Sequence, residues 1–368
     1  MGPEPLPSPR IGVVDRRRAA LVEALGIIAP GRPLRDGLDR ILQANKGALI
    51  LVGDDAEVLS ICSGGFLLDA EFTPQRLSEL AKMDGAIILA PDASRIARAN
   101  VHLVPSPNVP TSETGTRHRT AERVARSIDV PVIAVSEDMS VITMYRFDDK
   151  RVLETIARLL SRANQALSTL ERYRDRLDRV TTTLTASEVE DLVTLRDVVT
   201  VLQRADMVRR IAEEIEGYIV ELGSDGRLVL LQLEELMAGV EDQRRQVVRD
   251  YHPEDDSHSA GEVVAELASL STERLLDPTT VGGLLLDVDN PDLEFGLQPR
   301  GYRLLSRIPR IQEPTIAAMV TRFGTLQKVM RSDAEDLQAI PDVDAATAQT
   351  IKDGLTRLAE TTILDRYS

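Results

Sequence analysis

The sequence predicts an α/β domain in its first part, followed by two regions built from helices alone. Three observations lead to this prediction. Up to about residue 150, short apolar runs alternate with amphipathic stretches, as in strands interleaved with helices. From Val152 onward, apolar residues recur at intervals of three and four over long stretches. After residue 300, short helical patterns are separated by tight turns that contain proline.

The length and composition limit the class of protein. The 368 residues exceed the ~250–300 that one hydrophobic core usually serves, so two or three domains are expected. Aromatic residues make up only 3%, which requires aliphatic cores. Cys62 is the only cysteine, which excludes an intrachain disulfide and a cysteine-based zinc cluster. No apolar run approaches the ~20 residues of a bilayer span, so we expect a cytoplasmic protein without a membrane partner.

The α/β domain is predicted to occupy residues 18–150, after a mobile tail over residues 1–17 that is rich in proline and arginine. A helical pattern covers Leu34–Leu42, and Gly47 opens the buried-strand run Ala48–Val52. The remaining expected elements are strands at 86–89, 101–104, 130–135 and 141–145, and helices at 75–82 and 116–128.

Residues 151–299 are predicted to form a helical spine. No glycine or proline interrupts the chain from Val152 to Gly217, which favours long helices that form a spine packed against neighbouring helices. This region carries 30 acidic and 16 basic residues, an excess most simply explained by a solvated surface. Loops are expected at 252–262 and 287–299.

Residues 300–368 are predicted to form short helices. A helix-start signature lies in Ser332–Leu337, where Ser and Asp precede further acids. The turn Ile340–Asp344 then leads into a last helix, Ala345–Glu360.

Two segments of the α/β domain have the chemistry of a nucleotide site. Asp84 and Gly85 stand at the mouth of an apolar strand, and a carboxylate there suits a hard divalent cation. The run Thr116-Arg117-His118-Arg119 follows Gly115 at a predicted helix start, where backbone N–H groups, a hydroxyl and guanidinium groups suit phosphate oxygens. Each segment also has an ordinary explanation. Asp-Gly is most often a turn, and Arg-His-Arg is usually a solvated basic face.

The two segments occur together in a way that resembles the diadenylate cyclase family. The resemblance rests on Asp84-Gly85-Ala86, followed about thirty residues later by Gly115–Ala121. It extends to Ser63–Phe66, Arg98–Pro105 and Pro131–Ser136, and the stretches 160–173 and 191–198 resemble the spine of the DNA-integrity-scanning branch.

The resemblance implies a nucleotide-binding cyclase domain, with a mixed sheet flanked by helices, that condenses two ATP molecules into cyclic di-AMP and two pyrophosphates. Two subunits would meet face to face, within a homo-octamer. Asp84 would bind Mg²⁺ or Mn²⁺ and help to activate the 3′-hydroxyl, with Arg117, His118 and Arg119 as further catalytic groups. The implied nucleotide contacts are Gly85, Leu103, Thr116, Arg117, His118, Arg119, Thr120 and, more weakly, Ser136.

The resemblance also implies a C-terminal helix-hairpin-helix module that binds branched DNA such as Holliday junctions. The expected hairpin glycines are replaced here by Ile340-Pro341-Asp342-Val343-Asp344, whose carboxylates repel phosphate. Two interpretations follow. Either DNA is bound weakly through nearby cations, or the module has only a structural role. The candidate cations are Arg300, Arg303, Arg307, Arg310, Arg322 and Lys328.

Two other functions compete with the cyclase. One is an ATP-binding, DNA-scanning scaffold with little or no turnover, against which the intact Asp84 and Arg117–Arg119 speak. The other is a metal-dependent nuclease, which needs several clustered carboxylates where the sequence offers only Asp84.

Overall fold

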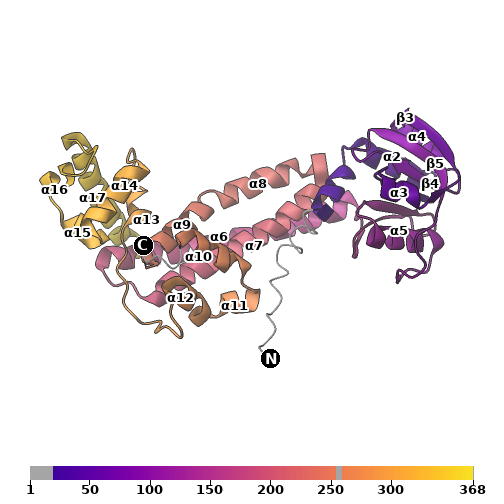
Figure 1. The fold of residues 1–368 in the computed structure, drawn as a ribbon. Helices are drawn as coiled ribbons and strands as arrows, with labels where there is room; N and C mark the ends of the chain where they lie inside the picture. Colours follow the sequence, from indigo (N-terminus) through magenta and orange to yellow (C-terminus); the bar gives the residue numbers. More distant parts are fainter. Residues whose placement is uncertain (1–19, 254–258, 368) are drawn as a thin grey trace, which may run out of the picture. The chain divides into compact units, whose positions relative to one another are not determined.

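The structure is a computed structural model that describes residues 20–253 and 259–367, without the side chains of 359 and 361–367. The tail predicted over residues 1–17 lies outside the described residues. The chain divides into two compact units (Figure 1). The first holds described residues 20–165 and 215–231, and the second holds 166–214 and the described residues from 232 onward.

The first unit is built on a mixed sheet of eight strands in the order β2-β5-β4-β1-β6-β7-β8, with β3 also paired to β5. Only β1 and β4 run parallel among these pairs, and the others are antiparallel. The strands are β1 Ala48–Val52, β2 Cys62–Ser63, β3 Phe66–Glu71, β4 Ala86–Leu89, β5 Arg95–Leu103, β6 Val132–Ser136, β7 Val141–Arg146 and β8 Asp149–Val152.

Helices cover both faces of this sheet because its central strands are apolar on both sides. Ile50 points to the face covered by α2 (Pro33–Gln43) and α4 (Pro74–Leu80). The next residue, Leu51, points to the face covered by α5 (Thr116–Ser127) and α3 (Ala56–Ser60). Both side chains are fully buried. The predicted α/β fold with a mixed sheet is confirmed, and two-sided burial explains the continuous apolar runs.

Three strands of the sheet were not predicted. β3 is exposed along nearly its whole length, and β8 is exposed and charged. β2 has only two residues. Lying at or near the sheet edges, these strands lack the burial that produces a recognisable apolar pattern.

The predicted helical spine is present, but it is not one helix. α6 (Ile156–Glu190) ends before Asp191, which adopts φ +60°, and α7 (Leu195–Leu222) begins after it. The Asp197 carboxylate accepts hydrogen bonds from Thr194 N–H and Oγ1–H at 3.0 and 2.8 Å, which fixes the start of α7. Gly217 lies inside α7.

Shorter helices complete the second unit and the end of the first. They are α8 (Arg227–Met237), α9 (Val240–Tyr251), α10 (Ala260–Ser269), α11 (Thr272–Leu276) and α12 (Pro278–Leu286). α10 begins inside the loop predicted over 252–262, because Ser259 and Glu262 form a capping box. Within the described residues, no helix is both long and apolar enough to cross a bilayer.

The C-terminal helices surround a small aliphatic core of their own. They are α13 (Tyr302–Leu305), α14 (Glu313–Phe323), α15 (Leu326–Arg331), α16 (Ala334–Gln338) and α17 (Ala345–Tyr367). Asp333 and Asp336 form a capping box at α16, as the sequence predicts. Turns 306–312 and 339–344 are the two hairpins that join α13 to α14 and α16 to α17.

Candidate active site

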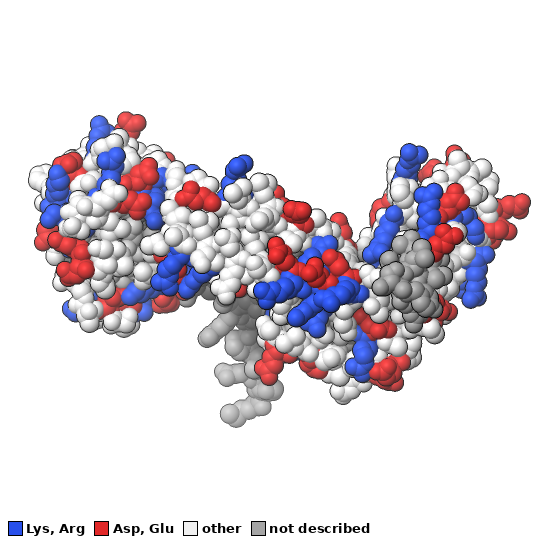
Figure 2. Space-filling view, turned by 180° about the vertical axis from the view of Figure 1, so that it is seen from behind, with Lys and Arg blue, Asp and Glu red and all other residues white. Residues whose placement is uncertain are grey.

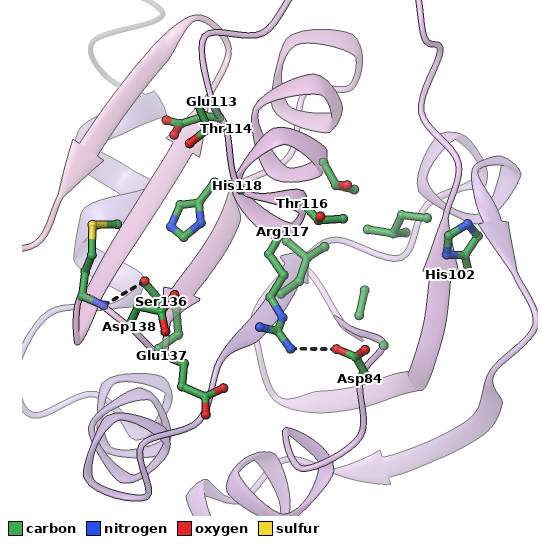
Figure 3. A pocket seen from close by; sticks show the side chains of 18 of the residues that line it. Asp84, His102, Glu113, Thr114, Thr116, Arg117, His118, Ser136, Glu137 and Asp138 are labelled. Atoms are coloured by element: carbon green, nitrogen blue, oxygen red, sulfur yellow. Dashed lines mark hydrogen bonds and ion pairs between the residues drawn. The ribbon is translucent and has the colours of Figure 1, made fainter.

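A pocket of about 790 Å³ opens beside the start of α5 (Figure 3). Its walls come from the loop that holds Asp84 and Gly85, from the end of β5, from the N-terminus of α5 and from the residues that follow β6. Of the predicted site residues, the pocket is lined by Asp84, Gly85, Leu103, Thr116, Arg117, His118, Thr120 and Ser136. Residues that lie up to about fifty positions apart in the sequence therefore share one cavity.

Asp84 and Arg117 face each other across this pocket. Arg117 Nη2 donates to Asp84 Oδ1 at 2.7 Å, while 93% of the Asp84 side chain stays exposed. Gly47 makes room for this arrangement, because a Cβ at Gly47 would lie 2.4 Å from Arg117 Nη1. The acid therefore remains accessible to a ligand, and the guanidinium is already oriented towards it.

The N-terminus of α5 offers free backbone donors. Gly115 is the N-cap residue in an extended conformation (φ −75°, ψ 142°), and no side chain among the described residues caps the helix. The N–H groups of the first turn therefore point towards the pocket with the positive end of the helix dipole. Arg117 and His118 lie in that same turn. This combination favours binding of an anion such as phosphate.

The loop before α5 is held rigid by side chains of the helix that it precedes. The Glu122 carboxylate accepts from Thr111 Oγ1–H at 2.5 Å and from Ser112 N–H at 2.9 Å. Arg123 Nε donates to the Val109 carbonyl at 3.0 Å. These bonds fix the approach to Gly115 before any ligand binds, which is the preorganisation that an electrostatic binding site requires.

Glu113 connects the loop to the sheet behind the pocket. Its Oε1 accepts from Tyr145 Oη–H at 2.9 Å and pairs with Lys150 Nζ at 2.5 Å. Although burial opposes this, the bonds from Lys150 and Tyr145 hold the pKa of Glu113 below its usual value. Burial lowers the pKa of the neighbouring His118, against the opposing charge of Glu113. Burial therefore favours the neutral form of the His118 imidazole.

Two of the predicted site residues also have structural contacts that the sequence did not indicate. Arg119 is not among the residues that line the pocket, and its guanidinium donates to the carbonyls of Glu113 and Thr114 at 3.4 and 3.1 Å. Gly85 borders the pocket, but a Cβ there would lie 2.4 Å from the backbone of Asn100 on β5. Close packing of β4 on β5 therefore already requires glycine at this position, whatever its contact with nucleotide.

Sequence reasoning missed several residues that line the pocket. They are His102, Glu113, Thr114, Glu137, Asp138 and Met139. Glu137 and Asp138 could have been predicted from their position directly after the apolar strand that ends in Ser136. Polar residues at the ends of strands are common in binding sites. His102 is exposed.

Comparison with known proteins shows the class of protein to which this chain belongs. Three family profiles match: "DisA bacterial checkpoint controller nucleotide-binding" over 35–149, "DisA bacterial checkpoint controller linker region" over 153–288 and "SAM-like Helix-hairpin-helix tandem" over 302–357. With the mixed sheet and its pocket, these matches define a protein of the diadenylate cyclase class.

Close relatives then give the family. The DNA integrity scanning protein DisA of Frankia alni is 54% identical over 345 residues, covering 93% of this chain and 96% of that one. DisA of Streptomyces coelicolor is 52% identical over 348 residues, covering 94% and 93%. The chain belongs to the DisA family, which confirms the resemblance. A crystal structure of DacA from Staphylococcus aureus aligns at 20% identity over 39% of this chain and 90% of that one, with a TM-score of only 0.27, too low to add support.

The family implies ATP as the substrate and a divalent cation, and the donor groups of the pocket fit such a cation. Among the described residues, no group of three or more His, Cys, Asp or Glu is placed to hold a metal by itself. Mg²⁺ and Mn²⁺ need no such group, because one or two carboxylates together with substrate phosphates suffice for them. Four carboxylates line the pocket: Asp84, Glu113, Glu137 and Asp138. A triphosphate beside them requires a cation to offset the repulsion.

Proposed function

We propose that this chain condenses two ATP molecules into cyclic di-AMP and two pyrophosphates. The observation that carries the proposal is the pocket in which exposed Asp84, the uncapped start of α5 and Ser136 come together, in a chain of the DisA family. In each half-reaction, the 3′-hydroxyl oxygen of one ATP bonds to the α-phosphorus of the other. The bond from that phosphorus to the bridging oxygen breaks, pyrophosphate leaves with the electron pair, and the proton of the attacking hydroxyl passes to water.

The residues of the pocket would divide this work between them. The N–H groups at the start of α5, with Thr116, Arg117 and Thr120, would hold the phosphates. Neutral His118 would donate a hydrogen bond there without adding charge. A divalent cation held by Asp84 and the phosphates would neutralise charge that develops on the leaving group. Arg119 would act indirectly, by positioning the carbonyls of the loop before α5.

A twofold-symmetric product is made most simply by two identical sites that face each other. Apolar side chains near the pocket support such a contact between copies. Val104 follows the lining residue Leu103 and is 56% exposed, and Met139 lines the pocket and is 65% exposed. We propose that these residues lie between subunits, within an assembly such as an octamer.

Product analysis tests the proposed reaction. The purified chain is incubated with ATP and either Mg²⁺ or Mn²⁺, and the products are separated by chromatography. Cyclic di-AMP and pyrophosphate in a 1:2 ratio are expected, and 3′-deoxy-ATP should give no cyclic product because it lacks the attacking hydroxyl. The rate per subunit should fall on dilution if two chains form each site. ATP left intact with both metals would instead favour the ATP-binding, DNA-scanning scaffold.

We also propose that the C-terminal module binds branched DNA through its first hairpin. Arg310 in that hairpin is exposed, as are Arg322 on α14 and Lys328 on α15. Arg303, another candidate, was wrongly assigned from the sequence: it is 2% exposed and forms a buried ion pair with Glu188. Figure 2 shows basic and acidic side chains interspersed on the face it presents.

A salt-dependent mobility-shift assay with branched DNA tests this second proposal. Binding at low salt that weakens as salt rises is expected, and Arg310→Gln should weaken it further. No binding by the parent chain at low salt would leave the module with a structural role only.

A further inference from the structure

Residues of the second unit alone form another pocket, with a volume of about 780 Å³. Its walls come from α6, α9 and the glycine before it, α13, the turn that follows α13, and the first residue of α14. Two acids, Asp242 and Glu313, line the pocket. They are outnumbered by the arginines that line it: Arg174, Arg245, Arg249, Arg303 and Arg307.

Most of these guanidinium groups have partners. Arg174 pairs with Asp178 at 3.0 Å and also donates to two backbone carbonyls. Arg249 pairs with Glu313 and lies 3.9 Å over the Tyr302 ring. Arg245 pairs with Asp242, and Arg303 with Glu188. The guanidinium of Arg307 differs from these, because it has neither an ion pair nor a hydrogen bond in the part of the chain that the structure describes.

Two buried polar atoms of the pocket residues are also unpartnered within the described residues: Arg303 Nη1 and Gln246 Oε1. Leaving a buried donor of a charged group unpaired is costly, and such groups normally have a partner. The Gln246 amide can turn over and present its NH₂ group instead, since the two orientations occupy nearly the same space. Arg307 is exposed, and its pKa is lowered by partial loss of solvation and then by the charge of Arg303. Four of the five arginines have an acid partner, so Arg307 is the cation of this pocket that has no carboxylate of its own among the described residues.

We propose that this pocket is a binding site for a small phosphate-bearing anion, of which pyrophosphate is the simplest example. Guanidinium groups present paired N–H donors that match phosphate oxygens. A small anion is proposed in preference to a nucleic-acid backbone because the Arg303 guanidinium lines the pocket and is only 2% exposed. The bound anion would link α9 to the first hairpin through Arg249, Arg303 and Arg307.

Calorimetric titration of the full-length protein with pyrophosphate tests the proposal. Two classes of site are expected, one at the candidate active site and one in this pocket. Arg307→Gln should weaken one class about tenfold or more, the effect of losing one charge-assisted hydrogen bond. Arg307→Lys keeps the charge but loses the paired donors, and should bind more tightly than Arg307→Gln and less tightly than the parent.

Two further variants separate the sites. Arg331→Gln removes an exposed arginine of α15 that does not line the pocket, and should leave both classes of pyrophosphate site unchanged. Arg117→Gln should weaken only the other class, at the candidate active site. Because no turnover is measured, a failure of the proposed cyclase reaction would leave this result intact.

Two results would overturn the proposal. One is a titration of Arg307→Gln that matches the parent in both classes of site. The other is a loss of DNA affinity in Arg307→Gln with pyrophosphate binding unchanged, which would assign Arg307 to the nucleic-acid backbone instead.

Discussion

The helices α5 and α17 each begin directly after a connecting loop or turn. The first turns of the two helices nevertheless have opposite electrostatic character. The start of α5 has no side-chain cap and carries Arg117 and His118 in its first turn. At the start of α17, the Asp344 carboxylate accepts from Thr347 N–H at 2.8 Å, and hydrogen bonds from Thr347 hold the pKa of Asp344 below its usual value. The first site is open to a phosphate, and the second already holds an anion that belongs to the protein.

This difference shows that a helix N-terminus becomes a phosphate site only when the flanking residues leave it open. The second hairpin also carries Asp342 at φ +61°, where a glycine would fit without strain. The Asp344 carboxylate therefore occupies the start of α17, and both carboxylates of this hairpin repel phosphate. The start of α5, in contrast, attracts phosphate. Four variants test how far this contrast accounts for function.

Arg117→Gln should have the largest effect, because it removes the cation beside both Asp84 and the start of α5. We expect turnover to fall about 10²–10³-fold, the usual loss for one preorganised donor. Formation of cyclic di-AMP is measured under saturating ATP, with Arg40→Gln, an exposed arginine on α2, as the control. Turnover within twofold of the parent would show that Arg117 does not contribute to the reaction.

Gly47→Ala should have the next largest effect, although residue 47 carries no functional group. The added Cβ would meet Arg117 Nη1 at 2.4 Å and displace the guanidinium from Asp84. We expect turnover to fall about tenfold with little change in melting temperature, since a flexible side chain can move aside. Gly26→Ala is the matched control, because nothing lies within 4 Å of a Cβ there. Equal turnover in both variants would show that the Arg117 position does not matter.

Removing the two negative charges from the second hairpin should increase the affinity of the C-terminal module for DNA. Asp342→Gly relieves the left-handed conformation, and Asp344→Asn keeps an N-cap oxygen while removing its charge. We expect the double variant to bind branched DNA several-fold more tightly in a mobility-shift assay, since two repulsive charges are lost. An unchanged dissociation constant at low salt would show that this hairpin lies outside the DNA contact.

Glu113→Gln should have the smallest effect, on pH dependence. The charge of Glu113 opposes the lowering of the His118 pKa by burial, so its removal should lower that pKa further. A histidine that binds a proton more weakly in the folded chain makes folding less stable as pH falls below its unfolded value of about 6.5. We therefore expect the melting temperature of the variant to fall more steeply than that of the parent between about pH 7 and pH 5. Parallel curves would show that Glu113 and His118 are not coupled.

The sequence was sufficient for the parts of the fold that burial dictates. Ala48–Val52 and Ala86–Leu89 were predicted to the residue, because strands buried on both faces are continuous apolar runs bounded by polar residues. β3 and β8 were missed because exposed edge strands lack that pattern. The break in the spine at Asp191 was missed for a different reason: it depends on a left-handed aspartate and a Thr194–Asp197 cap, without glycine or proline.

The candidate site was predicted from motifs, but its supporting network was not. Asp84 and Arg117 were proposed as site residues because a carboxylate suits a divalent cation and an arginine at a helix start suits phosphate. Glu113, Tyr145 and Lys150 lie on a loop and two strands, and their contact arises only when the sheet folds. The burial of Arg303 had the same cause, because its partner Glu188 is 115 residues away.

The most direct test of the account compares Asp84→Asn with the parent chain, with both ATP binding and product formation measured in the presence of Mn²⁺. Asp84 is 93% exposed, so the substitution should leave the fold and the α5 phosphate contacts intact. If Asp84 has the proposed role, the variant still binds ATP but forms no detectable cyclic di-AMP. Product formation at the parental rate would contradict the role assigned to Asp84 and, with it, the proposed reaction at this pocket.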